Sequence, residues 1–216
     1  MIDLQNADEL LTTTRGVRKR IDFDREVPLS LIEACVDVAL QAPCGTGAST
    51  NAGVGSAVPH FVVVTSPEKK KAVGDVYRAA HHPYIDHHAA QDPAREAAGG
   101  FDLARWQTDH FEDYPVLVLV CGNAPVDQLS PGMQVGMWGS ILPGAWSFML
   151  AARARGLGSC WTTIHLDGHT APMAEALGLP DHVSQGVLIP VGFYTGKTFK
   201  RATRPAAKDV MHLDGW

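Results

Sequence analysis

The chain has 216 residues, of which 45% are hydrophobic and 19% are charged, and its formal net charge is -5. This composition is that of a globular protein and argues against extended disorder, and the acidic balance argues against nucleic acid as the main partner. The amino terminus has acidic residues and no apolar core, so we expect no signal peptide, and four cysteines without a CxxC pair favour a reduced, cytoplasmic protein.

The first part of the chain shows alternating helix and strand signals. Leu10 and Leu11 are expected to face inward on a first short helix, Pro28 stands at the start of a second helix, and Pro43 stands at its end. A run of β-branched residues then predicts a buried strand. The expected elements are a helix over 7–14, a helix over 29–42, a strand over 61–65 and a helix over 69–80.

Residues 81–112 are polar and carry the weakest secondary-structure signal in the chain. We expect helical pieces that form a surface excursion or lid. The motif HHPYIDHH at 81–88 could bind a transition metal, but only Asp86 is a nearby carboxylate, and the spacing is not that of a zinc site. A polar lid is therefore the preferred interpretation.

The most apolar stretch, 133–166, predicts a helix without a polar face that lies at the centre of the core. Its apolar run is shorter than a bilayer span of roughly 20 residues, so we expect no membrane insertion. Pro143 is expected to kink this helix or to lie close to its start. Gly156 and Gly158 are stop signals, and the β-branched and aromatic run 159–164 predicts a short buried strand.

The remaining elements interleave with these. An apolar strand is expected over 116–123, a short helix over 172–179 and another strand over 186–191, followed by a basic tail over 194–216. The whole chain, 1–216, is predicted to form a single domain.

Two basic clusters are candidates for an anion site. The run 15–20 contains the densest positive charge, and a second set, Lys200, Arg201 and Arg204, lies near the other end of the chain. Arginine offers forked donors that suit a phosphate, so the two clusters would form one pocket if the chain ends converge. The alternative is a solvated patch that pairs with the nearby aspartates.

The glycine-rich segment 44–57 lacks the form of a nucleotide P-loop. It is either a flexible surface loop or a backbone surface for a flat ligand. Cys44 has no histidine or aspartate at a spacing that supports a catalytic triad. His165 follows a predicted strand, where functional sites commonly lie, although a structural histidine is the preferred interpretation.

Taken together, four stretches in the same order resemble the FMN-dependent nitroreductase family. Each stretch is modest alone, but the ordered set is specific and covers nearly the whole chain. The stretches are Thr14-Arg15-Gly16-Val17-Arg18; Ala39-Leu40-Gln41-Ala42-Pro43 with the following Phe61-Val62-Val63-Val64; Ala151-Ala152-Arg153-Ala154-Arg155-Gly156-Leu157-Gly158-Ser159-Cys160-Trp161; and Leu177-Gly178-Leu179-Pro180 with Val187–Gly192 and the basic tail.

The resemblance implies an α+β fold, a nitroreductase-like α/β/α sandwich with a central, mostly antiparallel sheet, in an intertwined homodimer with FMN at the subunit interface. It implies hydride transfer from NAD(P)H to the flavin N5 and on to a nitroaromatic, a quinone or a similar small-molecule acceptor in ping-pong order. No catalytic side chain is implied, because the flavin N5 carries the chemistry.

The same resemblance implies which residues hold FMN. The residues that would bind the phosphate, the ribityl chain and the pyrimidine edge of FMN are Arg15, Gly16, Val17 and Arg18. Arg204, helped by Lys200 or Arg201, would complete the phosphate pocket. Those that line the ring are Pro43, Cys44 and Gly45. Those that place backbone groups at the reactive edge are Thr163, Ile164 and His165.

The chain departs from the family pattern at two places. Thr14 stands where the family has its first arginine, and 57–60 reads Ala-Val-Pro-His where the family has an Asn-x-Gln-Pro-Trp segment; Asn51 is the candidate substitute for the asparagine. These departures keep two alternatives open. One is a dedicated flavin oxidase or desaturase of a secondary metabolite, and the other is a non-catalytic protein that binds a flavin or deazaflavin.

Overall fold

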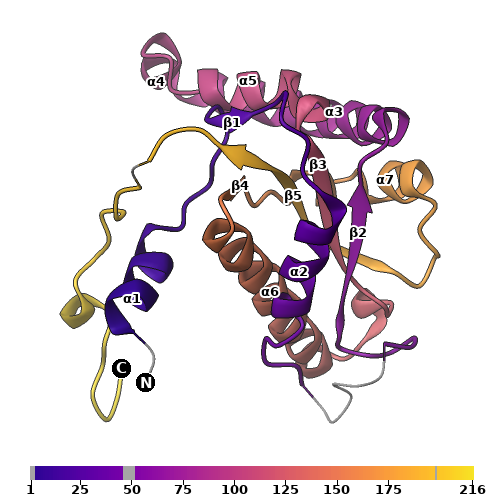
Figure 1. Ribbon diagram of the computed structural model, residues 1–216, viewed down its shortest axis with the longest axis vertical. Coiled ribbons are helices and arrows are strands. Elements are labelled where there is room, and N and C mark those ends of the chain that lie inside the picture. Colours follow the sequence, from indigo (N-terminus) through magenta and orange to yellow (C-terminus); the bar gives the residue numbers. More distant parts are fainter. Residues whose placement is uncertain (1–2, 46–51, 198) are drawn as a thin grey trace.

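A five-stranded antiparallel sheet lies between two layers of helices in the computed structural model, which describes residues 3–45, 52–197 and 199–216 (Figure 1). The strand order is β1-β5-β3-β2, and β4 also pairs with β5. The strands are β1 (Ile21–Asp22), β2 (Pro59–Val64), β3 (Val116–Gly122), β4 (Leu157–Ser159) and β5 (Ser184–Tyr194). The predicted sandwich with a mostly antiparallel sheet is confirmed.

The two central strands, β3 and β5, are buried on both faces, which explains their continuous apolar sequences. Val118 pairs with Ile189 and Leu119 pairs with Leu188. Because successive side chains on a strand point to opposite faces, these two pairs belong to different layers of the core.

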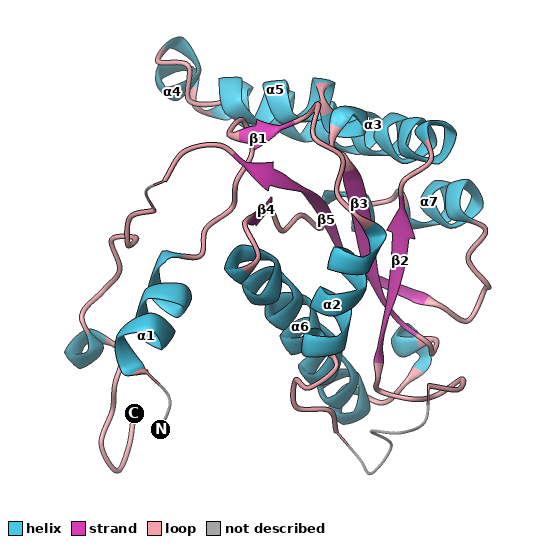
Figure 2. Cartoon of the chain, in the orientation of Figure 1, coloured by secondary structure: helices cyan, strands magenta, loops and turns pink. Residues whose placement is uncertain are grey.

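One face of the sheet is covered by α2 (Leu29–Ala39) and α6 (Pro131–Ala154) (Figure 2). By length and composition α6 could cross a membrane, but Ile141 and Phe148 are fully buried against the sheet, as expected of a core helix. A Cβ on Gly144 would stand 2.7 Å from the ring of Pro59, so this glycine sets how closely α6 approaches β2.

The other face is covered by α3 (Pro67–Gln91), α5 (Asp102–Asp109) and α7 (Thr170–Leu177), with the short α4 (Pro93–Ala97) beyond them (Figure 2). Tyr77 of α3 is 1% exposed and stacks on Phe111 with ring centroids 3.7 Å apart. The short 3₁₀ turns are Phe111–Asp113, Val126–Gln128, Ile164–Leu166 and Ala207–Asp209.

The first helix, α1 (Leu4–Thr13), stands apart from the sheet and lies beside the carboxyl-terminal tail (Figure 1). Asp3 caps α1 by accepting from the backbone N–H groups of the next turn. Only Leu10 of the predicted inward pair is half-buried. Leu11 is 54% exposed, so its predicted inward orientation is wrong.

Two further predictions need correction. The helix expected over 69–80 continues to Gln91, so 81–88 belongs to α3 and only later residues form separate helical pieces. The strand expected over 159–164 ends at Ser159, because beyond it only Thr162 pairs with β5, as one isolated bridge to Leu188. Of the two positions expected for Pro143, the structure shows the one inside the helix, because α6 continues on both sides of it.

Candidate functional site

The two chain ends converge, as one of the two interpretations of the basic clusters required. The Nη1 of Arg15 donates to the backbone oxygen of Lys200 over 3.5 Å. The backbone N–H of Val17 donates to the oxygen of Ser159 over 2.8 Å, and a Cβ on Gly16 would stand 3.3 Å from the sulfur of Cys160. The segment 15–18 therefore runs alongside the end of β4.

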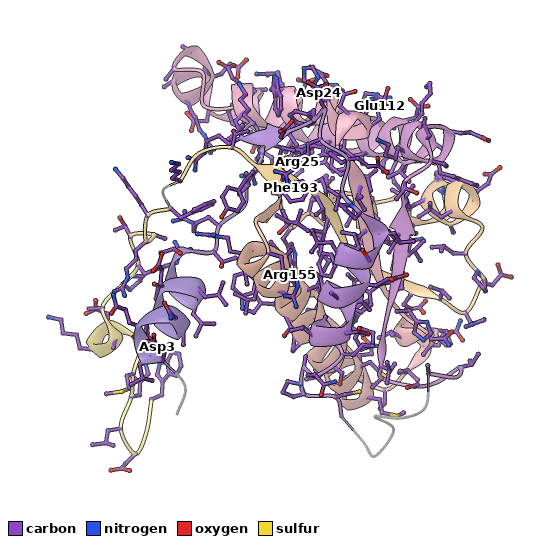
Figure 3. The ribbon with its side chains drawn as sticks, in the orientation of Figure 1. Asp3, Asp24, Arg25, Glu112, Arg155 and Phe193 are labelled. Carbon is purple, nitrogen blue, oxygen red and sulfur yellow. The ribbon has the colours of Figure 1, made fainter. Side chains whose placement is uncertain are left out.

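The other basic residues of this region lie on aromatic rings. Lys19 lies over Trp106 at 5.4 Å and Arg20 over Phe199 at 5.6 Å from the ring centroid. Arg25 lies 3.5 Å over the ring of Phe193 at the end of β5, where both are labelled in Figure 3. We therefore assign Lys19, Arg20 and Arg25 to packing against aromatic rings. Arg15 and Arg18 remain the candidates for binding an anion.

Arg18 is half-buried and is held by a residue that the sequence did not indicate. Its Nε donates to the Oε1 of Gln107 on α5 over 2.8 Å. Gln107 is 3% exposed, and its Nε2 has no hydrogen-bond partner in the part of the chain that the structure describes. The hydroxyl of Tyr114 donates to the backbone oxygen of Arg18 over 3.2 Å. A buried amide without an acceptor and a positioned guanidinium thus lie together.

A cavity of about 620 Å³ opens beside this group. Thr163 and Ile164, two of the residues expected at the reactive edge, are among its walls. Within the described ranges, the backbone N–H groups of these two residues donate to no protein acceptor. The lining residues are His81, Tyr84, Trp161, Thr162, Thr163, Ile164, Leu166 and Asp167. The cavity therefore offers backbone donors next to aromatic walls.

His165, the third residue of that predicted set, points away from solvent. Its side chain is fully buried, and neither ring nitrogen has a partner among the described residues. Burial lowers the pKa of His165 to about 4, so the ring is neutral at pH 7. A hydrogen-bonded structural histidine was expected here; the structure instead shows a buried imidazole without bonds.

The predicted ring-lining segment, Pro43 to Gly45, does not line this cavity but lies along α6. The backbone N–H of Gly45 donates to the Oγ of Ser140 in the first half of α6 over 2.9 Å. The segment 15–18 lies beyond the other end of α6, roughly 20 Å further along the helix axis. Gly45 is therefore separated from 15–18 in one copy of the chain, whereas Pro43 lines a hollow with Leu10 of α1 and Arg155 at the end of α6. Asn51 lies outside the described residues.

Only part of the basic tail contacts the rest of the protein. Lys200 contacts Arg15 through its backbone, and Arg201 lines a small hollow of about 300 Å³ against α1. Arg204 is exposed, and its Nη1 donates to the neighbouring oxygen of Thr203. Within the described ranges, no group of three or more His, Cys, Asp or Glu side chains could hold a metal ion, so the histidines of 81–88 do not form such a site.

The sequence profile of the nitroreductase family matches residues 13–193. The chain belongs to the nitroreductase family. A protein of Methanothermobacter thermautotrophicus, named as an NADH dehydrogenase/NAD(P)H nitroreductase, is 27% identical over 214 residues, which cover 96% of this chain and 86% of that protein. The family inferred from four ordered stretches is therefore confirmed, and with it the oxidoreductase class.

Solved structures share the fold. The nitroreductase-like family protein from Bacillus cereus covers 100% of both chains at 16% identity with a TM-score of 0.69. An iodotyrosine deiodinase bound to FMN and 3-iodo-L-tyrosine matches 96% of this chain and 98% of its own at 18% identity and a TM-score of 0.69. The FMN and NADPH-dependent nitroreductase NfnB from a Sphigopyxis species matches 97% and 99% at 20% identity and a TM-score of 0.68.

Proposed function

We propose that this nitroreductase-family chain is an FMN-dependent oxidoreductase of the cytoplasm that uses NAD(P)H to reduce a nitroaromatic, a quinone or a similar small acceptor. When bound, FMN supplies the redox chemistry, by taking a hydride from NAD(P)H and then passing electrons to the acceptor in ping-pong order. The observation that carries this proposal is the convergence of 15–18 with the end of β4 around donors that lack protein acceptors.

The donor set fits a flavin nucleotide. The phosphate and the pyrimidine edge of FMN present mainly acceptors, which call for guanidinium and N–H donors. Arg15 and Arg18 supply the guanidinium groups, the Nε2 of Gln107 is a buried donor without an acceptor, and Thr163 and Ile164 supply free backbone donors. We assign Lys200, Arg201 and Arg204 to the phosphate end because the backbone of Lys200 accepts a hydrogen bond from Arg15.

The chain's own residues then have three tasks. Arg18 holds positive charge where the pyrimidine edge becomes negative, and Gln107 fixes the direction of that guanidinium. The backbone of Thr163 and Ile164 orients the reactive edge. Trp161 and Tyr84 supply the aromatic part of the cavity wall. No side-chain nucleophile is needed.

We further propose that the working form is a homodimer in which a second copy supplies Pro43, Cys44 and Gly45. Two observations support this. Gly45 bonds to the first half of α6 whereas 15–18 lies beyond the other end of that helix in one chain, and the tail exposes apolar side chains such as Met211 (71%) and Leu213 (86%) that a second copy would cover. The four cysteines are free thiols, which suits a reducing compartment.

The test is an absorption spectrum of the purified protein with FMN, before and after anaerobic NADH or NADPH. Bands at roughly 370 and 450 nm that bleach with reductant are expected of a flavin enzyme of this class. Flavin that stays bound but unreduced by either nicotinamide would support the non-catalytic alternative. A protein that stays colourless after incubation with FMN would overturn the proposal.

A further inference from the structure

His81 forms part of the wall of the 620 Å³ cavity and is held there by α5. Its Nδ1 lies 2.6 Å from the Oγ1 of Thr108, and the same hydroxyl lies 2.8 Å from the backbone oxygen of Ala104. Both distances are hydrogen-bond distances, so each contact needs a proton between its two heavy atoms.

The number of protons determines the tautomer of His81. Thr108 has one hydroxyl proton, and a carbonyl oxygen has none to give. The hydroxyl therefore donates to Ala104, and the proton of the other contact must come from Nδ1–H of His81. A neutral imidazole that is protonated on Nδ1 presents Nε2 as an acceptor with a free lone pair.

Two further observations keep this acceptor available. Burial lowers the pKa of His81 to about 4, with smaller contributions from His82 and from the positive charge of Arg18, so the ring is neutral at pH 7. In the part of the chain that the structure describes, no group hydrogen bonds to the Nε2 of His81. The lone pair is thus free for a molecule in the cavity.

The rest of the cavity wall indicates the kind of molecule. Tyr84, Trp161 and Leu166 are 46%, 36% and 37% exposed and offer aromatic and apolar surface. Asp167 adds a second acceptor, and neither lysine nor arginine occurs among the described lining residues. Such a wall favours a flat, neutral ring that carries a hydrogen-bond donor, and it disfavours an anion.

We propose that His81 is a specificity-determining residue that selects electron acceptors carrying a hydroxyl or N–H group on an aromatic framework, through a hydrogen bond to its Nε2. Thr108 is the positioning residue that holds the ring and its tautomer. This proposal depends on the proposed function only in naming the occupant of the cavity as an electron acceptor.

The kinetic test compares 4-nitrobenzyl alcohol with its methyl ether, which differ in the donor but keep the nitro group. The FMN-loaded wild type is expected to favour the alcohol in kcat/KM by roughly threefold to tenfold, the value of one neutral hydrogen bond. His81→Phe keeps a ring and should bring this ratio to one, and Thr108→Val should lower it in part. His82→Phe is the matched control, since His82 pairs with Asp109 outside the cavity and the ratio should not change.

A second experiment measures the protonation of His81 directly and does not require catalytic turnover. Long-range ¹H–¹⁵N correlation spectra of the histidine-labelled protein, with His81→Phe for assignment, should show Nδ1 protonated and Nε2 bare at pH 7. The Nε2 signal should shift with 4-nitrobenzyl alcohol and not with the ether.

The outcomes separate this inference from the proposed function. A protonated Nε2, or an unchanged substrate ratio in His81→Phe, would overturn it. Equal losses for both probes together with a weakened affinity for FMN would also overturn it, because His81 would then serve the cofactor. A shift of the Nε2 signal with the alcohol in a protein that reduces neither probe would support this inference while the proposed function fails.

Discussion

The two faces of the sheet have different chemistry, although the same strands supply both. On the face under α2 and α6, Val116, Val118 and Val120 of β3 meet a layer that is almost wholly aliphatic and aromatic hydrocarbon. On the opposite face, Leu117 and Leu119 share their core with the tyrosines Tyr77 and Tyr114. Buried polar side chains occur on both sides of the sheet: Ser140 lies on α6 and donates to the backbone of its own helix, whereas Gln107, Thr108 and His165 come from helices and turns outside the first face.

This difference suggests that the first face mainly stabilises the fold and that the second face mainly binds the ligand. A closely packed apolar layer stabilises the fold because it removes hydrocarbon from water and fills the interior at high density. The second face keeps unpaired polar atoms at Gln107 and His165, which weaken the fold unless a ligand or a protonation state compensates them. If this division is correct, changes on the first face should act on stability and leave flavin binding intact, whereas changes on the second should act on flavin binding or on the pH dependence of stability.

The largest expected effect is on the apolar face. Phe148→Ala removes a fully buried ring that packs against Phe61 and should lower the free energy of unfolding by about 3–5 kcal/mol, because the cavity left behind cannot close. Denaturant unfolding measures this. Under native conditions FMN affinity should stay close to that of the wild type. A loss of affinity comparable to the loss of stability would mean that the two faces are not separable.

The next effect is a pH dependence carried by His165. Its pKa is lowered from 6.5 to about 4, so the unfolded chain binds more protons between these values. Stability is complete above pH 6.5 and falls as the pH drops towards 4, by about 3 kcal/mol for this group.

His165→Leu should flatten that slope in acid titrations followed by circular dichroism. His169→Leu, on the following turn, is the control and should leave the slope unchanged. An identical slope in His165→Leu would show that other groups carry the acid sensitivity; His81 is the first to test, since its pKa is lowered into the same window.

A smaller effect concerns Gln107 and Arg18. Gln107→Leu removes the acceptor that holds Nε of Arg18 and should weaken FMN binding by roughly 10- to 100-fold, the range for a hydrogen bond to a charged group. Fluorescence titration of FMN measures it. Gln185→Leu is the matched control, because Gln185 is also buried but bonds to Thr170 instead. Equal losses in both variants would point to a general loss of structure.

The smallest expected effect is in the tail. Arg204→Ala should lower FMN affinity by roughly tenfold, and less at high salt, because an exposed cation is screened. Lys208→Ala, in the same tail, should have little effect. Retention of FMN through gel filtration in Arg204→Ala, equal to that of the wild type, would remove the two-ended phosphate pocket from the account.

Periodicity and apolar runs predicted the sheet and its apolar face well. The buried helix over 131–154 and the strands β2, β3 and β5 are carried by long hydrophobic patterns that leave few alternatives. The strand over 159–164 failed because propensity does not specify a pairing partner: β5 continues to pair with β4 only as far as Ser159.

The sequence predicted few of the contacts on the polar face. Gln107 and Thr108 lie in the segment with the weakest pattern, and their contacts with Arg18 and His81 join residues 89 and 27 positions apart. Family resemblance supplied Arg18 and Thr163 because those motifs are local. Partners brought by a long helix such as α3 follow from tertiary packing, which no local pattern encodes.

The central claim is that the polar face binds FMN only when a second copy completes the site. Two differently tagged chains, Arg18→Glu and Gly45→Trp, would be co-expressed and the mixed dimer isolated through both tags. Each variant alone should form colourless homodimers, whereas the mixed dimer has one site with both halves intact and should recover flavin absorbance and its bleaching by NAD(P)H. A mixed dimer as colourless as its folded parents would contradict the account.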